Sequence, residues 1–245
     1  MPHSTDLQSK LDNITTQTRA LVQPSRLAIT DEAVQALFLT GIESRILPIG
    51  ATAPAFDLPA AAAAGIKPSA PNGPLVHSSD LLAIGPLIVV FFRGRWCPYC
   101  MTQLEAWQAA YEKMRESRKD DARGHGALLV AISPQLPRQN DFTAQHHNLT
   151  FPLLSDAGSH LAAAFRIAYT VPEPMQQHYR SIMINIPFIN GDQGPNTWRL
   201  PIPATFVIKP TRDAATGTVT GTIAFAEAHA DHRVRPDPQD VLAVL

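Results

Sequence analysis

The sequence predicts an α/β fold in which helices flank a central mixed sheet and a helical extension precedes it. Residues 86–133 contain two apolar runs separated by a helical pattern, which is typical of a βαβ unit with parallel strands. Residues 204–227 contain two β-like runs about a polar turn, which predicts an antiparallel hairpin at the sheet edge. Residues 5–46 carry apolar side chains at helical spacing. We therefore expect an extension at residues 1–47 and one α/β domain at residues 48–245.

Composition and charge narrow the classes of function. The chain has 245 residues, of which 45% are hydrophobic, so it can bury a core without structural disulfides. Its 20 basic and 21 acidic residues leave a net charge of −1, which excludes a global field that would attract nucleic acid or anionic lipid. No apolar run approaches the ~20 residues that span a bilayer, and the N-terminus does not resemble a secretion signal. We expect a soluble cytoplasmic protein whose partner is a small molecule or another protein.

The N-terminal residues predict two helices. Leu7, Leu11, Ile14 and Leu21 form the apolar stripe of the first helix. The second helix is expected to start at Thr30, a good N-cap residue, with Val34, Leu37, Phe38 and Ile42 on one face. Such a pair is marginal alone, so its stripes should pack on the main domain or on a second subunit. Periodicity does not distinguish these alternatives, and a homodimer through the N-terminal helices stays open.

The remaining elements are predicted from turn-forming residues and from the periodicity of apolar residues. Residues from about 48 are rich in Pro, Gly and Ala, which suggests extended segments and turns, and the alanine run 59–65 is expected to be a surface loop. We expect helices at 98–118 and 138–147, a short strand at 151–155, a short helix at 159–168, an irregular section at 171–200 and a final helix at 236–245.

Both cysteines of the chain lie in the stretch "FFRGRWCPYC". Cys97 follows an apolar run and precedes Pro98, which suits the first position of a helix, so Cys97 is expected to be the N-cap. The unpaired N–H groups of the helix end, with Arg93 and Arg95 nearby, would stabilise its thiolate and lower its pKa. Cys100 lies one turn later, at a separation that a disulfide can bridge. This pattern predicts a redox-active dithiol in which Cys97 attacks and Cys100 resolves.

Two alternatives explain the cysteine pair less well. A structural zinc site usually has four ligands, and the histidines that could supply the others are scattered, with no second pair at finger-like spacing. The motif "AHADHR" places His229 and His232 around Asp231, but the spacing is loose for a metal site. An inert buried pair is the other alternative, although it does not explain Pro98 or the strand-to-helix corner. We therefore expect no metal and no other cofactor.

The order of motifs resembles the peroxiredoxin-like branch of the alkyl hydroperoxide reductase and thiol-specific antioxidant (AhpC/TSA) superfamily, which has a thioredoxin fold. The resemblance covers almost the whole chain. It rests on the segments "IGATAPAFDLP", "VVFFRGRWCPYCMTQL", "LLVAISPQ", "FPLLSD", "NGD" with "WRLPIPATFVI", and "DHRVRPDPQDVLAVL".

The resemblance implies roles for individual residues. Cys97 takes the position of the cysteine that attacks peroxide, and Cys100 that of the second cysteine of a thioredoxin-like dithiol. Pro203 matches the proline that thioredoxin-fold proteins hold in cis beside the active site, at a substrate-docking edge. Trp96 directly precedes the nucleophile and is expected to form a wall of the pocket.

The sequence also departs from the family pattern. Standard members carry Thr or Ser three residues before the nucleophile and Pro seven residues before it, whereas this chain has Gly94 and Val90 there. The arginine that they place near the "TFVI" strand is replaced by Pro203, so Arg93 or Arg95 has to supply the cation. The missing hydroxyl shifts the expectation toward disulfide exchange.

The sequence is compatible with three functions. The first is a thiol peroxidase in which Cys97 becomes a sulfenic acid, condenses with Cys100, and is recycled by thioredoxin or a similar thiol donor. The second is a dithiol-disulfide oxidoreductase that uses the same two cysteines on disulfide substrates. The third is a non-catalytic interaction module built on the N-terminal helices.

Overall fold

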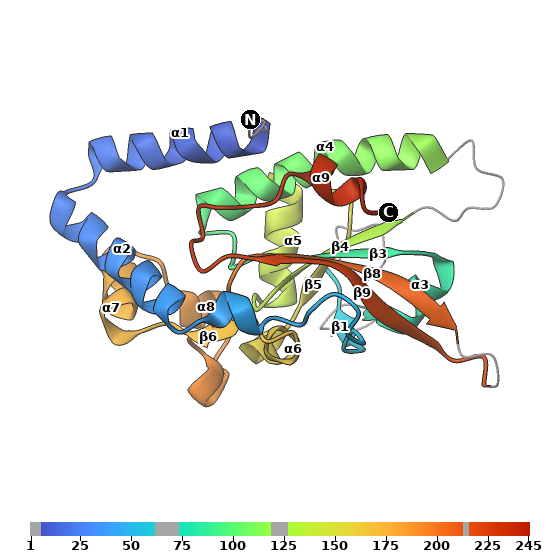
Figure 1. Ribbon diagram of the computed structural model, residues 1–245. Coiled ribbons are helices and arrows are strands. Elements are labelled where there is room, and N and C mark those ends of the chain that lie inside the picture. Colours follow the sequence, from blue (N-terminus) through green and yellow to red (C-terminus); the bar gives the residue numbers. More distant parts are fainter. Residues whose placement is uncertain (1–5, 62–73, 119–126, 213–215) are drawn as a thin grey trace.

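A five-stranded mixed sheet forms the centre of the computed structural model, which describes residues 6–61, 74–118, 127–212 and 216–245 (Figure 1). Its strands, in spatial order, are β5 (Leu153–Ser155), β4 (Leu128–Ser133), β3 (Leu87–Phe91), β8 (Ala204–Arg212) and β9 (Val219–Ala228). The strands β3, β4 and β5 are parallel, whereas β8 is antiparallel to both β3 and β9. The mixed sheet, the βαβ unit and the C-terminal hairpin are therefore confirmed.

Helices cover both faces of this sheet. The helices α1 (Asp6–Leu21), α4 (Pro98–Arg118), α5 (Pro137–His146) and α9 (Pro238–Leu242) contribute to one apolar core. The helices α3 (Ser78–Ile84) and α6 (His160–Ala164) contribute to the core on the opposite face. Side chains of β3 alternate between the two cores, with Ile88 and Val90 in the first and Leu87 and Val89 in the second. A strand buried on both faces is apolar throughout, which explains the uninterrupted run in the sequence.

The second N-terminal helix starts earlier than the sequence pattern predicts. The helix α2 spans Pro24–Leu39, with proline in its first turn, so the expected start at Thr30 is wrong. Proline fits a helix start because the amide N–H that it lacks has no partner there in any case. Residues 24–29, which lie before the expected start, are therefore part of the helix.

The first N-terminal helix packs within the chain. Leu7 and Leu11 are 2% and 0% exposed and belong to the core cluster that contains Leu104 and Trp107 of α4, while Leu21 is 86% exposed. Figure 1 shows α1 running along α4, and α2 continuing past the end of the sheet beside α7 (Glu173–Ser181). The buried half of the stripe thus serves packing inside the chain. A homodimer through the remaining exposed part stays a prediction.

Replacing Leu11 with alanine is expected to destabilise the protein by about 2–5 kcal/mol, because it leaves a cavity between α1 and α4. Leu21→Ala on the same helix is the matched control and should change the free energy of unfolding by less than about 0.5 kcal/mol, since Leu21 is exposed. Urea denaturation of both variants measures the difference. Equal effects of the two substitutions would contradict the packing of α1 on α4.

The section that we expected to be irregular, 171–200, contains the helices α7 and α8 (Ile186–Asn190). A short ribbon, β6 (Ala168–Thr170) with β7 (Arg199–Pro201), brackets these helices and brings α7 to the end of the sheet near α2. A second ribbon pairs β1 (Asp57–Pro59) with β2 (Leu75–His77), and 3-10 turns lie at Ile42–Arg45, Ala157–Ser159 and Gly194–Asn196. Most of the alanine run 59–65 lies outside the described residues.

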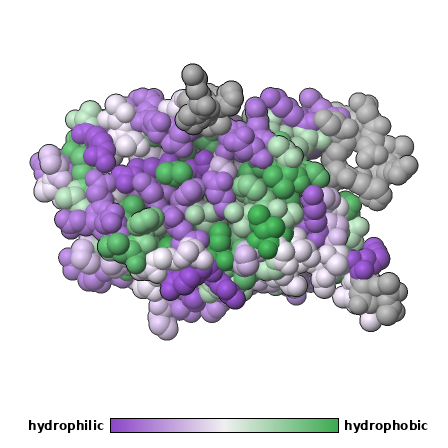
Figure 2. Space-filling view, viewed as in Figure 1, coloured by the Kyte–Doolittle hydropathy of each residue, from purple (hydrophilic) through white to green (hydrophobic). Residues whose placement is uncertain are grey.

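The hydropathy of the surface differs along the long axis of the molecule. Figure 2 shows a mostly hydrophilic surface over α1 and α2, and apolar residues gathered near the middle of this face, where β9 is in front. The strand β9 is an edge of the sheet, and its side chains are mostly half-buried. Among the described helices, none is both long and apolar enough to cross a membrane.

Candidate active site

The cysteine pair sits where β3 passes into α4. The Cys97 N–H donates to the Gly94 carbonyl at 3.1 Å, and the Cys97 carbonyl accepts from Met101 N–H at 3.1 Å, the first hydrogen bond of the helix. Cys97 is therefore the N-cap, as expected, and Pro98 holds the first helical position. Both thiols are free and buried, with exposed fractions of 2% for Cys97 and 0% for Cys100. The two thiols are close enough that each shifts the pKa of the other.

Two buried guanidinium groups face the thiols. Arg93, from the end of β3, donates from Nη2 to the Tyr179 hydroxyl and acts electrostatically on both cysteines. Arg235, from the segment before α9, donates from Nη2 to Cys100 Sγ at 3.7 Å and from Nε to Gln103 Oε1 at 2.9 Å. Each arginine is 4% exposed. Because an arginine stays charged even when it is buried, the two side chains place a strong positive potential at the dithiol.

The pair shares one proton, with the negative charge on Cys100. Burial opposes the charged form of Cys100, but the hydrogen bond from Cys97 and the charges of Arg235 and Arg93 lower its pKa to about 5. Burial raises the pKa of Cys97, and the hydrogen bond and charge of Cys100 raise it further, against the opposing effect of Arg93 and Arg235. The expectation that Cys97 has the lower pKa is therefore wrong. The helix end favours a thiolate at Cys97, but the neighbouring thiol and Arg235 favour it more at Cys100.

A pocket opens at Cys97 between helices that are distant in the sequence. Its walls come from α1, α2, the start of α4, α7 and the segment around His232 and Arg233. An ion-pair cluster holds this rim together, because Asp31 of α2 binds both Arg233 at 2.7 Å and Arg19 of α1 at 3.3 Å. The N-terminal helices are thus part of the pocket that surrounds Cys97.

The AhpC/TSA family model matches residues 49–213, which is about two thirds of the chain and includes both cysteines. The chain belongs to the AhpC/TSA family. The match begins next to residue 48, where we place the boundary between extension and domain. No match was found among curated proteins.

Solved structures agree with this assignment at the level of the fold. The peroxidoxin BcpB from Mycobacterium tuberculosis is 21% identical, and the alignment covers 81% of this chain and 96% of that protein with a TM-score of 0.51. The AhpC of Enterococcus faecalis is 14% identical, with coverages of 80% and 89% and a TM-score of 0.51. The chain therefore has the thioredoxin fold of the peroxiredoxins.

Gly94 occupies the position where the AhpC/TSA pattern expects a hydroxyl, and its geometry excludes one. Its φ of 153° lies outside the range that side-chain-bearing residues usually adopt, and an added Cβ would lie 2.5 Å from Trp96 Nε1. The indole of Trp96 fills this space and lines the pocket at Cys97, as expected. Its ring packs against Tyr179 at 4.9 Å between centroids, and the Arg93 guanidinium lies 4.7 Å from its centroid. Trp96 thus takes the place of the missing side chain.

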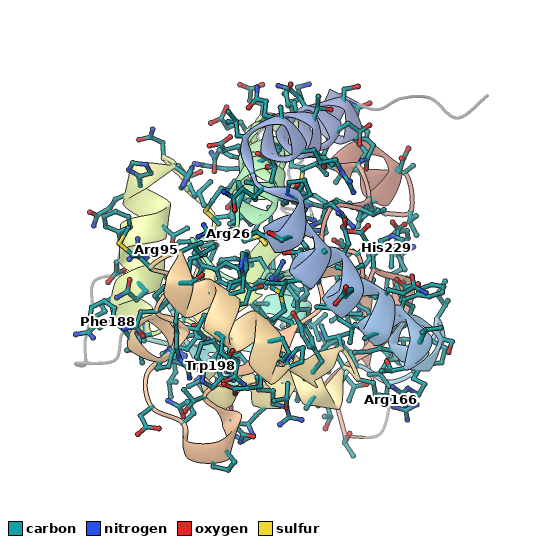
Figure 3. All side chains as sticks on the ribbon, turned by 90° about the vertical axis from the view of Figure 1, so that its left-hand side faces the viewer. Arg26, Arg95, Arg166, Phe188, Trp198 and His229 are labelled. Atoms are coloured by element: carbon teal, nitrogen blue, oxygen red, sulfur yellow. The ribbon has the colours of Figure 1, made fainter. Side chains whose placement is uncertain are left out.

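Of the two arginines before the motif, only Arg93 reaches the thiols. The Arg95 side chain points to α5, where Nε donates to Gln139 Oε1 at 2.9 Å and the guanidinium lies 4.7 Å from the Phe142 ring centroid. Figure 3 shows Arg95 on the α5 side of α7, away from α2. Arg95 is therefore excluded as the cation of this AhpC/TSA site.

Pro203 lies near the site, but its expected geometry is wrong. All peptide bonds of the described residues are trans, including Ile202–Pro203. The Ile202 N–H donates to the Ile167 carbonyl at 2.8 Å and the Pro203 carbonyl accepts from His229 N–H at 3.2 Å, so both residues are held as an extended link between β7 and β8. Pro203 lines an apolar slot that also contains Arg93. The substrate-docking edge that a cis proline implied is not formed in this way.

Three residues of the site were missed in the sequence. Arg235 lies beside Cys100, Tyr179 accepts from Arg93, and His232 lines the pocket with its ring 5.3 Å from that of Tyr99. Burial lowers the pKa of His232 well below its ordinary value, and the charges of Arg93, Arg235 and Arg233 lower it further. His232 therefore belongs to the pocket, although its motif in the sequence did not point to a site. In the described parts of the chain, no group of three His, Cys, Asp or Glu side chains could hold a metal ion.

Proposed function

We propose that this protein is a thiol-dependent peroxidase that reduces hydroperoxides through Cys97, with Cys100 as the resolving cysteine. One observation carries the proposal. The two buried thiols are close enough to shift each other's pKa, they lie beside the buried guanidiniums of Arg93 and Arg235, and Cys97 lines the pocket. The thiolate is the reactive form of cysteine, and positive groups stabilise it. Membership of the AhpC/TSA family supports peroxide as the oxidant.

In the first step, the Cys97 proton passes across the shared hydrogen bond to Cys100, which leaves a thiolate at the pocket. The sulfur of Cys97 attacks the terminal oxygen of the hydroperoxide, and the O–O bond breaks. Cys97 becomes a sulfenic acid, and the alkoxide leaves as the alcohol after it takes a proton from solvent. The Arg93 guanidinium can stabilise the negative charge that develops on the departing oxygen, because it lines the same pocket.

In the second step, the Cys100 sulfur attacks the Cys97 sulfenic acid. The S–O bond breaks, the hydroxide takes the Cys100 proton to form water, and an intramolecular disulfide forms. Two equivalents of a thiol, from thioredoxin or a similar donor, then restore the dithiol. A cytoplasmic location, where such donors keep thiols reduced, is part of this proposal.

Disulfide exchange is the second candidate function. It is favoured by Gly94, whose position leaves the site without the hydroxyl that standard peroxiredoxins use to bind peroxide. In this reaction the Cys97 thiolate would attack a substrate disulfide, and Cys100 would release the mixed disulfide. Both candidates use the same two cysteines.

Stopped-flow oxidation of the reduced protein distinguishes the two functions. Tryptophan fluorescence, to which Trp96 beside Cys97 contributes, follows the reaction with hydrogen peroxide, with an organic hydroperoxide and with a model disulfide. A peroxidase should lose two thiols faster with at least one hydroperoxide than with the disulfide. A clear preference for the disulfide would replace the first function by the second, and thiols that are inert to all three oxidants would refute both.

A further inference from the structure

An apolar slot extends away from the cysteine pocket between α2 and α7. Its lining is mostly apolar, and it includes Arg93. The side chains that matter here are those of Ala33, Val34, Leu37, Val171, Met175 and Ile202. Figure 3 looks onto this side of the molecule and shows α2 and α7 next to each other. The slot shares Arg93, Tyr179 and His232 with the pocket at Cys97, so the slot and the pocket have part of their walls in common.

Arg93 is the charged group of this slot. Of the lining residues that the structure describes, none is a carboxylate, and burial keeps His232 neutral. The Arg93 side chain is 4% exposed, and its Nε has no hydrogen-bond partner. A buried donor that has no hydrogen-bond partner is costly, and so is a buried charge that is only partly compensated. The guanidinium is therefore prepared for a ligand that supplies an acceptor and a negative charge.

The dithiol does not balance this charge. Arg93 and Arg235 bring two positive charges, while the proton-sharing cysteine pair brings one negative charge, and Arg235 contacts Cys100 directly. The phenols of Tyr169 and Tyr179 stay neutral, because burial raises the pKa of each. One positive charge in excess therefore remains in the lining of the apolar slot.

We propose that the slot between α2 and α7 binds an amphipathic carboxylate, with the carboxylate on Arg93 and the aliphatic chain along α2. Such a ligand satisfies Arg93 Nε, offsets the excess charge, and covers the apolar walls at the same time. This binding site goes beyond the proposed peroxidase activity. Because Arg93 also lines the pocket at Cys97, bound ligand should slow the oxidation of Cys97 by peroxide.

Isothermal titration calorimetry on the full chain, kept reduced with dithiothreitol, tests the proposal without any peroxide. Octanoate is the probe. Butyrate has the same carboxylate on a shorter chain and tests the contribution of the apolar walls, and octanamide is the neutral control of the same length as octanoate. We expect octanoate to bind at one site and each added methylene to tighten binding about fourfold. Octanamide should bind at least about tenfold more weakly than octanoate. Equal binding of octanoate and octanamide, or no binding of octanoate, would overturn the proposal.

Two matched pairs of variants locate the site. Arg93→Met should weaken octanoate binding at least about tenfold, whereas Arg95→Met, two residues away but directed to α5, should not change it. Ala33→Phe should fill the slot and abolish binding, whereas Gln35→Phe adds the same ring to an exposed position of α2. Unchanged binding in Arg93→Met or Ala33→Phe would place octanoate elsewhere and refute the site. Because calorimetry needs no peroxide, failure of this site and failure of the peroxidase are separate results.

Discussion

Replacing Cys97 with serine is expected to abolish turnover with every oxidant, although Cys100 has the lower pKa of the pair. Access decides the roles, because Cys97 lines the pocket and Cys100 is fully buried behind it, with Arg235 on its sulfur. A low pKa supplies the thiolate, but the oxidant has to reach the sulfur. The proton between the two sulfurs lets the charge on Cys100 become a reactive thiolate at Cys97.

Cys100→Ser is the matched variant and should react once. Its Cys97 sulfenic acid has no neighbouring thiol to close onto, so recycling needs an external thiol and over-oxidation increases. After one equivalent of peroxide, mass spectrometry should show one added oxygen on Cys97 in this variant and the loss of two hydrogens in the parent protein. Oxygen on Cys100 in Cys97→Ser, formed as fast as on Cys97 in Cys100→Ser, would reverse the assignment of roles.

The fold could be predicted because its signals are local. The apolar run before Cys97, the helix after it and the hairpin at residues 204–227 are each set by periodicity within a few residues, and the structure confirms them. The N-cap position of Cys97 was also predictable, since Pro98 marks the first helical position. The same reasoning failed at α2, where Pro24 is an equally good start signal that we did not use.

The electrostatics of the site could not be predicted, because they depend on contacts between distant segments. Arg235 follows Cys100 by 135 residues, and its side chain changes which cysteine carries the charge. His232 lies in a segment that looks like a polar loop, yet it reaches the pocket because Arg233 binds Asp31 of α2. Arg93 and Arg95 are equivalent in the sequence, and only the direction of each side chain separates them.

The second large effect is expected for Arg235→Met, which removes the cation that contacts Cys100. A charge-assisted hydrogen bond contributes about 1.5–3 kcal/mol, which corresponds to a rise of roughly 1–2 units in the pKa of the dithiol. The parent should stay reactive with peroxide down to about pH 5, where Cys100 takes up its proton. In the variant, reactivity with peroxide should begin to fall at a higher pH, because the thiolate is less stabilised. At pH 6 the thiolate fraction, and with it the oxidation rate, should therefore fall about 2- to 10-fold.

The shape of the pH profile separates this effect from a structural one. Since both proteins hold the thiolate at high pH, their rates should converge above about pH 9, which damage to the fold would not allow. Arg235→Lys keeps the charge and should restore most of the rate at pH 6, and Arg95→Met, whose side chain binds Gln139, should leave the profile unchanged. Rapid oxidation measured from pH 5 to pH 9, with circular dichroism of each variant, provides the comparison. A rate lowered equally at every pH would show that Arg235 supports the fold around Cys100 and does not set its charge.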